Sequence, residues 1–439
     1  MSNDKQNIEK LKNKLNFVNS YGFKYSDKIY NKNNVESLAT NLKDLKGKNN
    51  SFYYPLSINT WDNKEYEAIN KVVLSQNFTM GSRVKEFEEN FASHFGSKYS
   101  VMVNSGSSAN LLMIAALVLD KNIDLNEGDE VIVPTLSWAT TYYPLQQYKL
   151  KARFIDINLD TLNINEDSII SAISKKTKAI FAVNVLGNPC NFNKLKEICK
   201  KYNLLLIEDN CESLGAEYNN KYCGSFGITG SFSFYFSHHI HTIEGGMIIT
   251  DNESIYHHLL SLRAHGWIRD LPENNKIYKK KGNKFEDSFV FVLPGYNLRP
   301  NEINGSIGLE QLKKVNNIVK QRRDNAKVFL NLFKDHEHVK PQKELGKSSW
   351  FGFSILLDGK LKNKREKVLN KLNSYGIETR PIISGNFLKY PVTKFLDYTI
   401  CGETSNSEKI DRNGFFIGNN HVDISRELEY FEKVIKTLY

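Results

Sequence analysis

The sequence predicts an α/β protein with a mostly parallel sheet, followed by a smaller α+β domain. Short apolar strands alternate with helices between residues 99 and 250, which is typical of strands joined by crossover helices. Near Asn316 this alternation gives way to a long charged helix, and the 439 residues are enough for two domains. We therefore expect an N-terminal extension over residues 1–52, a large domain over 53–315 and a small domain over 316–439.

The elements of the large domain can be placed in order from the spacing of apolar residues. Helical spacing covers residues 65–95 with a break at 79–81, and a strand at 99–104 leads through a turn into a helix at 111–119. Further strands are expected at 130–134, 151–156, 179–184, 204–208, 230–236 and 246–250, and helices at 140–147, 166–173 and 193–201. In the Lys- and Asn-rich extension, Ile8, Leu11 and Leu15 have the spacing of a short helix.

Composition excludes several classes of protein. With 40% hydrophobic and 25% charged residues the chain is typical of soluble globular proteins, and no apolar run approaches the roughly 18 residues of a membrane span. The first residues contain no hydrophobic signal region, so we expect a cytoplasmic protein with neither a membrane nor a nucleic-acid partner. The net charge of +10 suits an anionic substrate, although solubility is the simpler explanation. Three lysines at 279–281 are interpreted as a solvated loop or, alternatively, as a contact to a nucleotide diphosphate.

The cysteines exclude a disulfide framework and an iron–sulfur cluster. There are five, at Cys190, Cys199, Cys211, Cys223 and Cys401, and none forms a CxC or CxxC pair. We expect them to be small buried residues in a reducing compartment. Cys211 lies next to a predicted site in the sequence and would line it.

A turn of small residues between a strand and a helix, at 104–110, has the composition of a phosphate site. Backbone N–H groups would be free there at the positive end of a helix dipole. The small residues are Ser105, Gly106, Ser107 and Ser108, and the later Ser233 and Ser237 would add hydroxyl groups. Many such turns are only helix caps, so the turn alone leaves both interpretations open.

Two side chains that follow strands would face the edge of the sheet where α/β proteins bind ligands. Trp138 comes shortly after the strand 130–134, where its ring would stack on a flat heterocycle or belong to the core. Asp209 ends an apolar strand, where its carboxylate would keep a pyridine nitrogen protonated or merely cap a loop.

A group of histidines follows a strand with alternating serines. His238, His239 and His241 lie between this strand, which we expect to end at His238, and the pair of glycines at 245–246. Their spacing is poor for converging on a metal ion, so we expect no metal site. An imidazole accepts and returns a proton near neutral pH, which makes His238 a candidate base.

The order of phosphate turn, aromatic residue, strand-end aspartate and Glu-Gly-Gly loop resembles the DegT/DnrJ/EryC1/StrS family of fold-type-I pyridoxal phosphate enzymes. The resemblance runs from about residue 53 to the C-terminus. Its segments are VNSGSSAN (103–110), SWATTYYP (137–144), EDNCES (208–213), RAHGW (263–267), LPGYNLRP (293–300) and SSWFGF (348–353). It implies a large domain with a mixed, mostly parallel sheet, a small C-terminal domain, and a pyridoxal or pyridoxamine phosphate cofactor.

The resemblance is closest to a branch with histidine in place of the usual lysine, the sugar 3-dehydratases. The family's lysine sits seven residues before the first glycine of the Gly-Gly pair, and counting back from Gly245 gives His238. An imidazole moves protons but cannot hold the cofactor covalently. The implied role of His238 is therefore that of a catalytic acid and base.

The remaining roles follow from the resemblance position by position. Gly106, Ser107, Ser108, Ser233 and Ser237 would bind the cofactor phosphate, Trp138 would stack on the ring, Asp209 would pair with the ring nitrogen, and Glu212 would lie near the ring hydroxyl. Asn297 would reach the phosphate of the partner subunit's site, which implies a homodimer. His265, Arg269 and Arg380 are candidate substrate contacts.

The implied reaction is removal of the 3-hydroxyl group from a nucleotide-linked 4-keto-6-deoxyhexose, with L-glutamate regenerating the cofactor amine. A GDP-linked 4-keto-6-deoxymannose of the colitose pathway fits the branch best. The CDP-sugar branch carries an iron–sulfur cluster, and the stretch 266–273 has none of its cysteines. The alternatives are a sugar aminotransferase with an unusual base, a CDP-sugar 3-dehydratase without the cluster, and a non-catalytic member of the family.

Overall fold

The computed structural model describes residues 52–439, and residues 53–439 form one compact unit. The predicted N-terminal extension, including the helix expected around Ile8, Leu11 and Leu15, lies outside the described residues. The expected division between residues 315 and 316 stays a prediction. Within the described residues, no helix is both long and apolar enough to cross a membrane.

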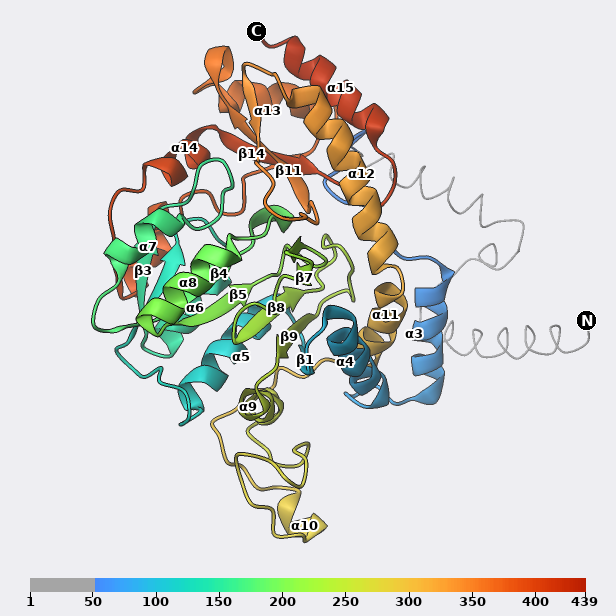
Figure 1. Ribbon diagram of the computed structural model, residues 1–439. Coiled ribbons are helices and arrows are strands. Elements are labelled where there is room, and N and C mark those ends of the chain that lie inside the picture. The colour runs from blue at the N-terminus through green and yellow to red at the C-terminus, as the bar shows by residue number, and fades with distance from the viewer. Residues whose placement is uncertain (1–51) are drawn as a thin grey trace, which may run out of the picture. The chain divides into compact units, whose positions relative to one another are not determined.

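An eight-stranded sheet forms the centre of the fold, in the order β1-β9-β8-β5-β4-β2-β3-β13 (Figure 1). Its strands are β1 (Tyr99–Val103), β2 (Glu130–Pro134), β3 (Lys151–Ile155), β4 (Thr177–Val183), β5 (Leu205–Asp209), β8 (Thr229–Ser233), β9 (Gly246–Thr250) and β13 (Tyr398–Ile400). All neighbours from β8 to β13 run parallel, and only β9 is antiparallel to its neighbours β1 and β8. The predicted mixed, mostly parallel sheet is confirmed.

Helices cover this sheet and connect its strands. They are α3 (Asn63–Ser75), α4 (Ser82–Phe95), α5 (Gly106–Leu119), α6 (Ala139–Gln147), α7 (Glu166–Ala172), α8 (Phe192–Tyr202), α9 (Glu253–Arg263) and α11 (Glu302–Leu312). Beyond α9, the short helix α10 (Lys284–Asp287) lies at the end of a loop that projects from the sheet (Figure 1). Most predicted helices agree to within a few residues.

Two predicted boundaries near the site are wrong. Helix α5 begins at Gly106 and not at residue 111, because the Ser105 side chain caps it by accepting a hydrogen bond from the Ser108 N–H. Strand β8 ends at Ser233, so His238 is not at a strand end. The chain turns after Phe234, where the His238 N–H donates to the Tyr235 carbonyl, and Tyr235 is exposed where a central strand would be covered.

A second, four-stranded antiparallel sheet lies in the C-terminal part, in the order β10-β11-β14-β12. Its strands are β10 (Val339–Pro341), β11 (Gly352–Leu357), β12 (Thr379–Arg380) and β14 (Gly414–Gly418). The helices of this part are α12 (Val315–Phe333), α13 (Arg365–Ser374), α14 (Ser405–Asn413) and α15 (Ser425–Lys436). Phe329, Phe353 and Leu428 belong to its core, and Tyr54 joins them from the other end of the described chain.

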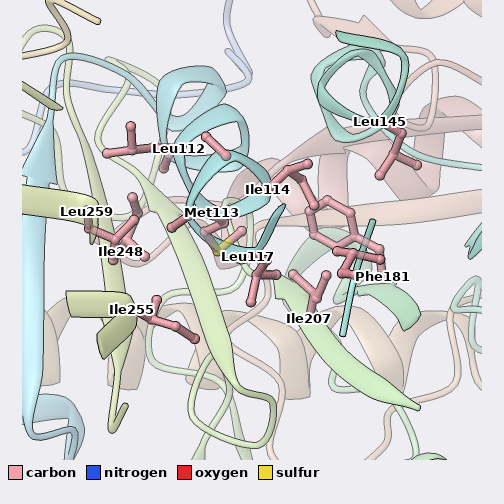
Figure 2. Close-up of a cluster of buried hydrophobic side chains, with 14 of the residues drawn as sticks. Leu112, Met113, Ile114, Leu117, Leu145, Phe181, Ile207, Ile248, Ile255 and Leu259 are labelled. Carbon is pink, nitrogen blue, oxygen red and sulfur yellow. The ribbon is translucent and has the colours of Figure 1, made fainter. Parts of the chain in front are cut away.

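Helix α5 lies at the heart of the large core. It is apolar around its whole circumference, as expected for a helix that is covered on every side. Figure 2 shows its residues among side chains from the sheet and from helices α6 and α9. The labelled residues are Leu112, Met113, Ile114, Leu117, Leu145, Phe181, Ile207, Ile248, Ile255 and Leu259. This packing fixes the N-terminus of α5 against the ends of the parallel strands.

The C-terminal part also contributes to the large sheet, which sequence reasoning missed. Strand β13 pairs in parallel with β3, so the chain returns to the first sheet after β12. The buried ring of Phe154 on β3 lies 5.6 Å from Tyr398 of β13 and 6.2 Å from Phe387, measured between ring centroids. These rings join the two parts of the described chain through apolar contacts.

We expect Phe154→Ala to destabilise the protein by about 3–5 kcal/mol, because it removes a fully buried ring and leaves a cavity. Urea denaturation measures this as a lower midpoint. Phe285→Ala is the matched control, since Phe285 is 88% exposed and should change stability by less than about 0.5 kcal/mol. Equal midpoints for the two variants would contradict the packing described for β13.

Candidate active site

Four segments meet at the edge of the sheet formed by the carboxyl ends of the parallel strands. They are the start of α5, the start of α6, the end of β5 and the loop after β8. Direct contacts join them: Asn110 of α5 and Thr141 of α6 both donate to Asp209 at the end of β5, and His238 of the loop after β8 contacts the Cys211 carbonyl oxygen. In open α/β sheets this edge is where ligands bind.

Asp209 is buried and its carboxylate is held in one orientation. Its Oδ2 accepts hydrogen bonds from Asn110 Nδ2 at 2.8 Å and from Thr141 Oγ1 at 2.7 Å, while Oδ1 accepts from the Cys211 N–H at 3.2 Å. The three donors fix the orientation of the carboxylate, and among residues 52–439 no cationic side chain pairs with it. Asp209 is thus suited to face a protonated ring nitrogen.

The neighbouring Glu208 points elsewhere and has a structural task. Its two oxygens accept hydrogen bonds from the backbone N–H groups of Gly224, Phe226 and Gly227. Burial raises the pKa of Glu208 to about 7, against the opposing effect of these donors. Of the two carboxylates that end β5, only Asp209 is directed at the site.

The turn predicted to bind phosphate is the start of helix α5, with Ser105 as its cap; phosphate binding there stays a prediction. A Cβ atom on Gly106 would lie 2.6 Å from the Cβ of Ser233, so only glycine fits where β8 and α5 meet. Ser107 donates from its hydroxyl to Thr140 Oγ1 at 3.0 Å, and its side chain is exposed. Of the N–H groups in the first turn of α5, that of Ser108 is taken by the Ser105 cap, and those of Gly106 and Ser107 are at the positive end of the helix dipole, which suits an anion.

Trp138 is not a core tryptophan. It precedes α6 as its N-cap residue and is 60% exposed, and no aromatic ring stacks on it among the described residues. Such an exposed aromatic surface is costly for a free protein and useful for binding a flat ligand. The arrangement leaves its ring available for stacking, as the sequence predicts.

His238 lies half-buried beside Cys211, the second residue after Asp209. Its Nδ1 is 2.7 Å from the Cys211 carbonyl oxygen. Because a carbonyl only accepts, Nδ1 carries the hydrogen and the lone pair is left on Nε2. Burial, reinforced by the charge of Arg322, lowers the pKa of His238 to about 4, against the opposing effect of the Cys211 carbonyl. At neutral pH the ring is therefore an uncharged base with a fixed tautomer.

The other two histidines of the loop have separate partners. His239 is fully buried and its Nε2 is 3.0 Å from the Ser349 carbonyl oxygen. His241 Nε2 lies 2.9 Å from Asn59 Oδ1, and its ring stacks on Trp61 with centroids 5.0 Å apart. Among residues 52–439, no group of three or more His, Cys, Asp or Glu side chains is arranged to hold a metal ion.

Glu212 and Ser237 lie near this base, and Asn297 lies apart. Glu212 accepts a hydrogen bond from the Leu186 N–H at 3.1 Å, and burial together with the charge of Asp209 raises its pKa to about 7. Ser237 adjoins His238 in the turn after β8. Asn297 is exposed and accepts from Arg299 Nε at 3.0 Å. No contact joins Asn297 to the other predicted site residues within this described chain.

The candidate substrate residues fall into two places. His265 and Arg269 follow α9 and surround Trp267, whose ring centroid is 4.8 Å from the His265 ring and 4.1 Å from the Arg269 guanidinium carbon. Arg380 lies on β12 of the other sheet, is exposed and pairs with Glu378. Sequence reasoning missed Trp267 as the centre of the first group.

Asn110 and Thr141 hold the Asp209 carboxylate, a contact that sequence reasoning missed. The sequence did contain a signal for Asn110, because it is the single amide side chain in a largely apolar helix. Phe351 gave no such signal, yet its ring centroid lies 5.1 Å from that of His238 and 5.8 Å from that of His239. It reaches the site only because the segment before β11 folds back over the loop.

Comparison with known proteins assigns the family. The model of the DegT/DnrJ/EryC1/StrS aminotransferase family matches residues 59–436. The chain belongs to this family. It is 53% identical over 385 residues to the GDP-4-keto-6-deoxy-D-mannose 3-dehydratase of Escherichia coli O55:H7 (strain CB9615 / EPEC), and the match covers 87% of this chain and 99% of that protein.

Solved structures of that enzyme have the same fold. A crystal structure of a GDP-4-keto-6-deoxymannose-3-dehydratase histidine-to-asparagine mutant with bound GDP-perosamine has a TM-score of 0.86 at 52% identity, covering 87% of this chain and 100% of that chain. Another, with a trapped PLP-glutamate geminal diamine, has a TM-score of 0.85 at 52% identity, covering 87% and 99%. The resemblance and the family fold predicted from the motifs are confirmed.

We expect His238 to be neutral at pH 6 in the cofactor-free protein, with its hydrogen on Nδ1. Nitrogen NMR of ¹⁵N-histidine-labelled protein measures both, and loss of the signal in His238→Asn assigns it. The folded pKa of about 4 lies below the ordinary 6.5, so the stability contributed by neutral His238 is present above pH 6.5 and lost as the pH falls toward 4. A protonated ring at pH 6 would contradict this environment.

Proposed function

We propose that this family member removes the 3-hydroxyl group from a GDP-linked 4-keto-6-deoxymannose, using pyridoxamine phosphate and L-glutamate. The observation that carries the proposal is the neutral imidazole of His238, held by the Cys211 carbonyl at 2.7 Å beside the directed carboxylate of Asp209. Identity of 53% to a GDP-4-keto-6-deoxy-D-mannose 3-dehydratase over nearly its whole length supports the same substrate.

The residues present fit the cofactor. Its phosphate would bind at the N-terminus of α5, where Gly106 and Ser107 offer backbone N–H groups, Ser108 offers its hydroxyl group, and Ser233 lies against Gly106. Ser237 would add a hydroxyl group, and Trp138 offers an exposed ring for stacking. Asp209 would meet the ring nitrogen and Glu212 the ring hydroxyl.

A bound pyridoxamine phosphate supplies an amine that joins the sugar's 4-keto carbon and a protonated ring that accepts an electron pair. Asp209 would keep the ring nitrogen protonated, because its three hydrogen-bond donors hold the carboxylate in one orientation toward the site. His238 Nε2 removes a proton from the carbon beside the ring. The same nitrogen then returns the proton to the hydroxyl at sugar carbon 3, which leaves as water.

His238 serves the glutamate half-reaction by the same proton movement, with 2-oxoglutarate as its product. Once water has freed the sugar from the cofactor, the nitrogen at carbon 4 is part of an enamine. The enamine tautomerises to an imine, and a second water converts the imine to the ketone and releases ammonia. Glutamate thereby supplies the two electrons of the deoxygenation. His265 and Arg269, grouped around Trp267, and the exposed Arg380 are the proposed contacts to the nucleotide-sugar.

The proposal includes a cytoplasmic homodimer with shared sites. Asn297 is exposed in the described chain, and its amide has one intrachain partner, Arg299. An exposed amide at this position is suited to reach the phosphate of a neighbouring subunit's site. The net charge of +10 favours the anionic cofactor and substrate without requiring any nucleic-acid partner.

We expect His238→Asn to lower the dehydration rate by about 10²–10⁴-fold, because it removes the proton carrier while keeping a similar volume. The assay follows loss of the 3-oxygen from GDP-4-keto-6-deoxymannose in the presence of glutamate, by mass spectrometry. His336→Asn, a histidine after α12, should leave the rate unchanged. Dehydration by His238→Asn at the rate of the unaltered protein would rule out His238 as the base.

We expect Asp209→Asn to lower the rate by at least about 100-fold, because an amide cannot keep the ring nitrogen protonated. The hydrogen bonds from Asn110 and Thr141 can still be accepted and only the 3.2 Å bond from the Cys211 N–H is lost, so the thermal midpoint should fall less than in Glu208→Gln. Glu208→Gln should do the opposite and lower stability more than the rate. It places an amide N–H₂ group against backbone N–H donors, which should lower the free energy of unfolding by about 1–3 kcal/mol. If Glu208→Gln loses the rate and Asp209→Asn does not, the carboxylates have been assigned the wrong way round.

A further inference from the structure

Two buried carboxamides on α11 hold the loop that carries His238. Asn304 and Gln311 are seven residues apart, about two helical turns, and therefore lie on one face of the helix. Gln311 accepts a hydrogen bond from the backbone N–H of residue 241, and Asn304 donates to the backbone carbonyls of residues 242 and 244. No site residue predicted from the sequence lies on this helix.

Asn304 uses its whole amide group in these contacts. Its Nδ2 donates to the Thr242 carbonyl at 2.6 Å and to the Glu244 carbonyl at 3.1 Å. Its Oδ1 accepts from the Asn301 N–H at 3.2 Å and closes the capping box of α11. The side chain is 8% exposed, so a substitution that removes the amide would leave buried carbonyls unpaired.

The residue between those two carbonyls, Ile243, is strained. Its φ is +73°, in the left-handed region that a β-branched side chain strongly disfavours. The side chain is 52% exposed, so burial within the described chain does little to offset the strain. A strained residue persists only where its surroundings enforce the conformation. The two bonds from Asn304, on either side of Ile243, do this, together with the Thr242 hydroxyl, which donates to the Glu244 carbonyl at 2.8 Å.

Gln311 fixes the preceding residues of the same loop. It is fully buried, and its Oε1 lies 3.3 Å from the His241 N–H and accepts from Thr60 Oγ1 at 2.6 Å. Its Nε2 donates to Glu65 at 2.8 Å. The loop is therefore held at residues 241–244 by α11 and at His238 by the Cys211 carbonyl.

We infer that Asn304 is a positioning residue, which forces Ile243 into its left-handed conformation and thereby sets where His238 presents Nε2. Without the two bonds from Asn304, Ile243 would relax toward ordinary φ values and move the loop that begins at His238. The catalytic consequence rests on the proposed function, whereas the change in loop structure does not.

Three variants separate this role from helix capping. Asn304→Ala removes both loop bonds and the capping box. Asn301→Ala removes the cap of the same helix but leaves both bonds from Asn304 Nδ2, so it is the matched control. The double variant Asn304→Ala/Ile243→Gly places glycine where a left-handed residue is needed, which makes the enforcing bonds dispensable.

The first readout is independent of activity. Diethyl pyrocarbonate modifies neutral imidazoles that solvent reaches, and peptide mass spectrometry locates each modified histidine. In the cofactor-free protein, His239 and His241 are buried and should react slowly. We expect Asn304→Ala to increase the modification rates of both histidines at least about tenfold, because the loop opens locally. Asn301→Ala should change these rates less than about twofold. In the double variant the rates should return to within about threefold of those of the unaltered protein.

The second readout is turnover with GDP-4-keto-6-deoxymannose and glutamate. A loop shift of the order of 1 Å should lower kcat of Asn304→Ala by about 10–100-fold with a smaller change in KM, and the double variant should recover most of it. Equal histidine modification in Asn304→Ala and Asn301→Ala, or a double variant as reactive as Asn304→Ala, would overturn the inference. Absence of dehydration in the unaltered protein would instead refute the proposed function and leave the modification test decisive for Asn304.

Discussion

The hydrogen bond between His238 and the Cys211 carbonyl is the interaction on which the rest of the site depends. It places the hydrogen on Nδ1, leaves Nε2 as the proton acceptor, and ties the loop after β8 to the end of β5. Burial then keeps the ring neutral by lowering its pKa to about 4. A histidine in solution would divide its time between two tautomers and a cation near neutral pH. Here one form is selected before any ligand binds, so the base is ready without reorganisation.

The sheet provides this interaction because three residues at and just after the end of β5 serve different partners. Glu208 anchors the backbone of the following turn, Asp209 faces the site, and Cys211 supplies the carbonyl for His238. Helix α5, buried on all sides, brings Asn110 to Asp209 and its own N-terminus to Ser233. The proposed contacts to the ring nitrogen and to the phosphate, and the proposed base, therefore lie within one junction of strand ends. Substitutions that disturb α5 should consequently affect both the stability of the core and the geometry of the site.

Much of this could be predicted from the sequence, because local patterns and motifs carried it. The strands 130–134 and 246–250 agree with β2 and β9 residue for residue. Asp209 and Trp138 were singled out from their positions at and after strand ends, and His238 from its spacing to Gly245 in the family motif. The end of β8 was predicted too late, because Tyr235 and Phe236 have high strand propensity and only the tertiary turn excludes them. Strand β13 and the contacts of Asn304 escaped prediction, since they join residues that are far apart in the sequence. The strained φ of Ile243 has no sequence signature, and glycine or asparagine would be expected there.

The central claim is that a neutral histidine in the place of a lysine lets the nitrogen leave the sugar. The most direct measurement is the stoichiometry of the unaltered protein acting on GDP-4-keto-6-deoxymannose with L-glutamate. Sugar, 2-oxoglutarate and ammonia are quantified in the same reaction by mass spectrometry and enzymatic assay. The account predicts equal amounts of 3-deoxygenated keto sugar, 2-oxoglutarate and ammonia. A product that keeps both its 3-oxygen and a nitrogen at carbon 4, with no free ammonia, would contradict it.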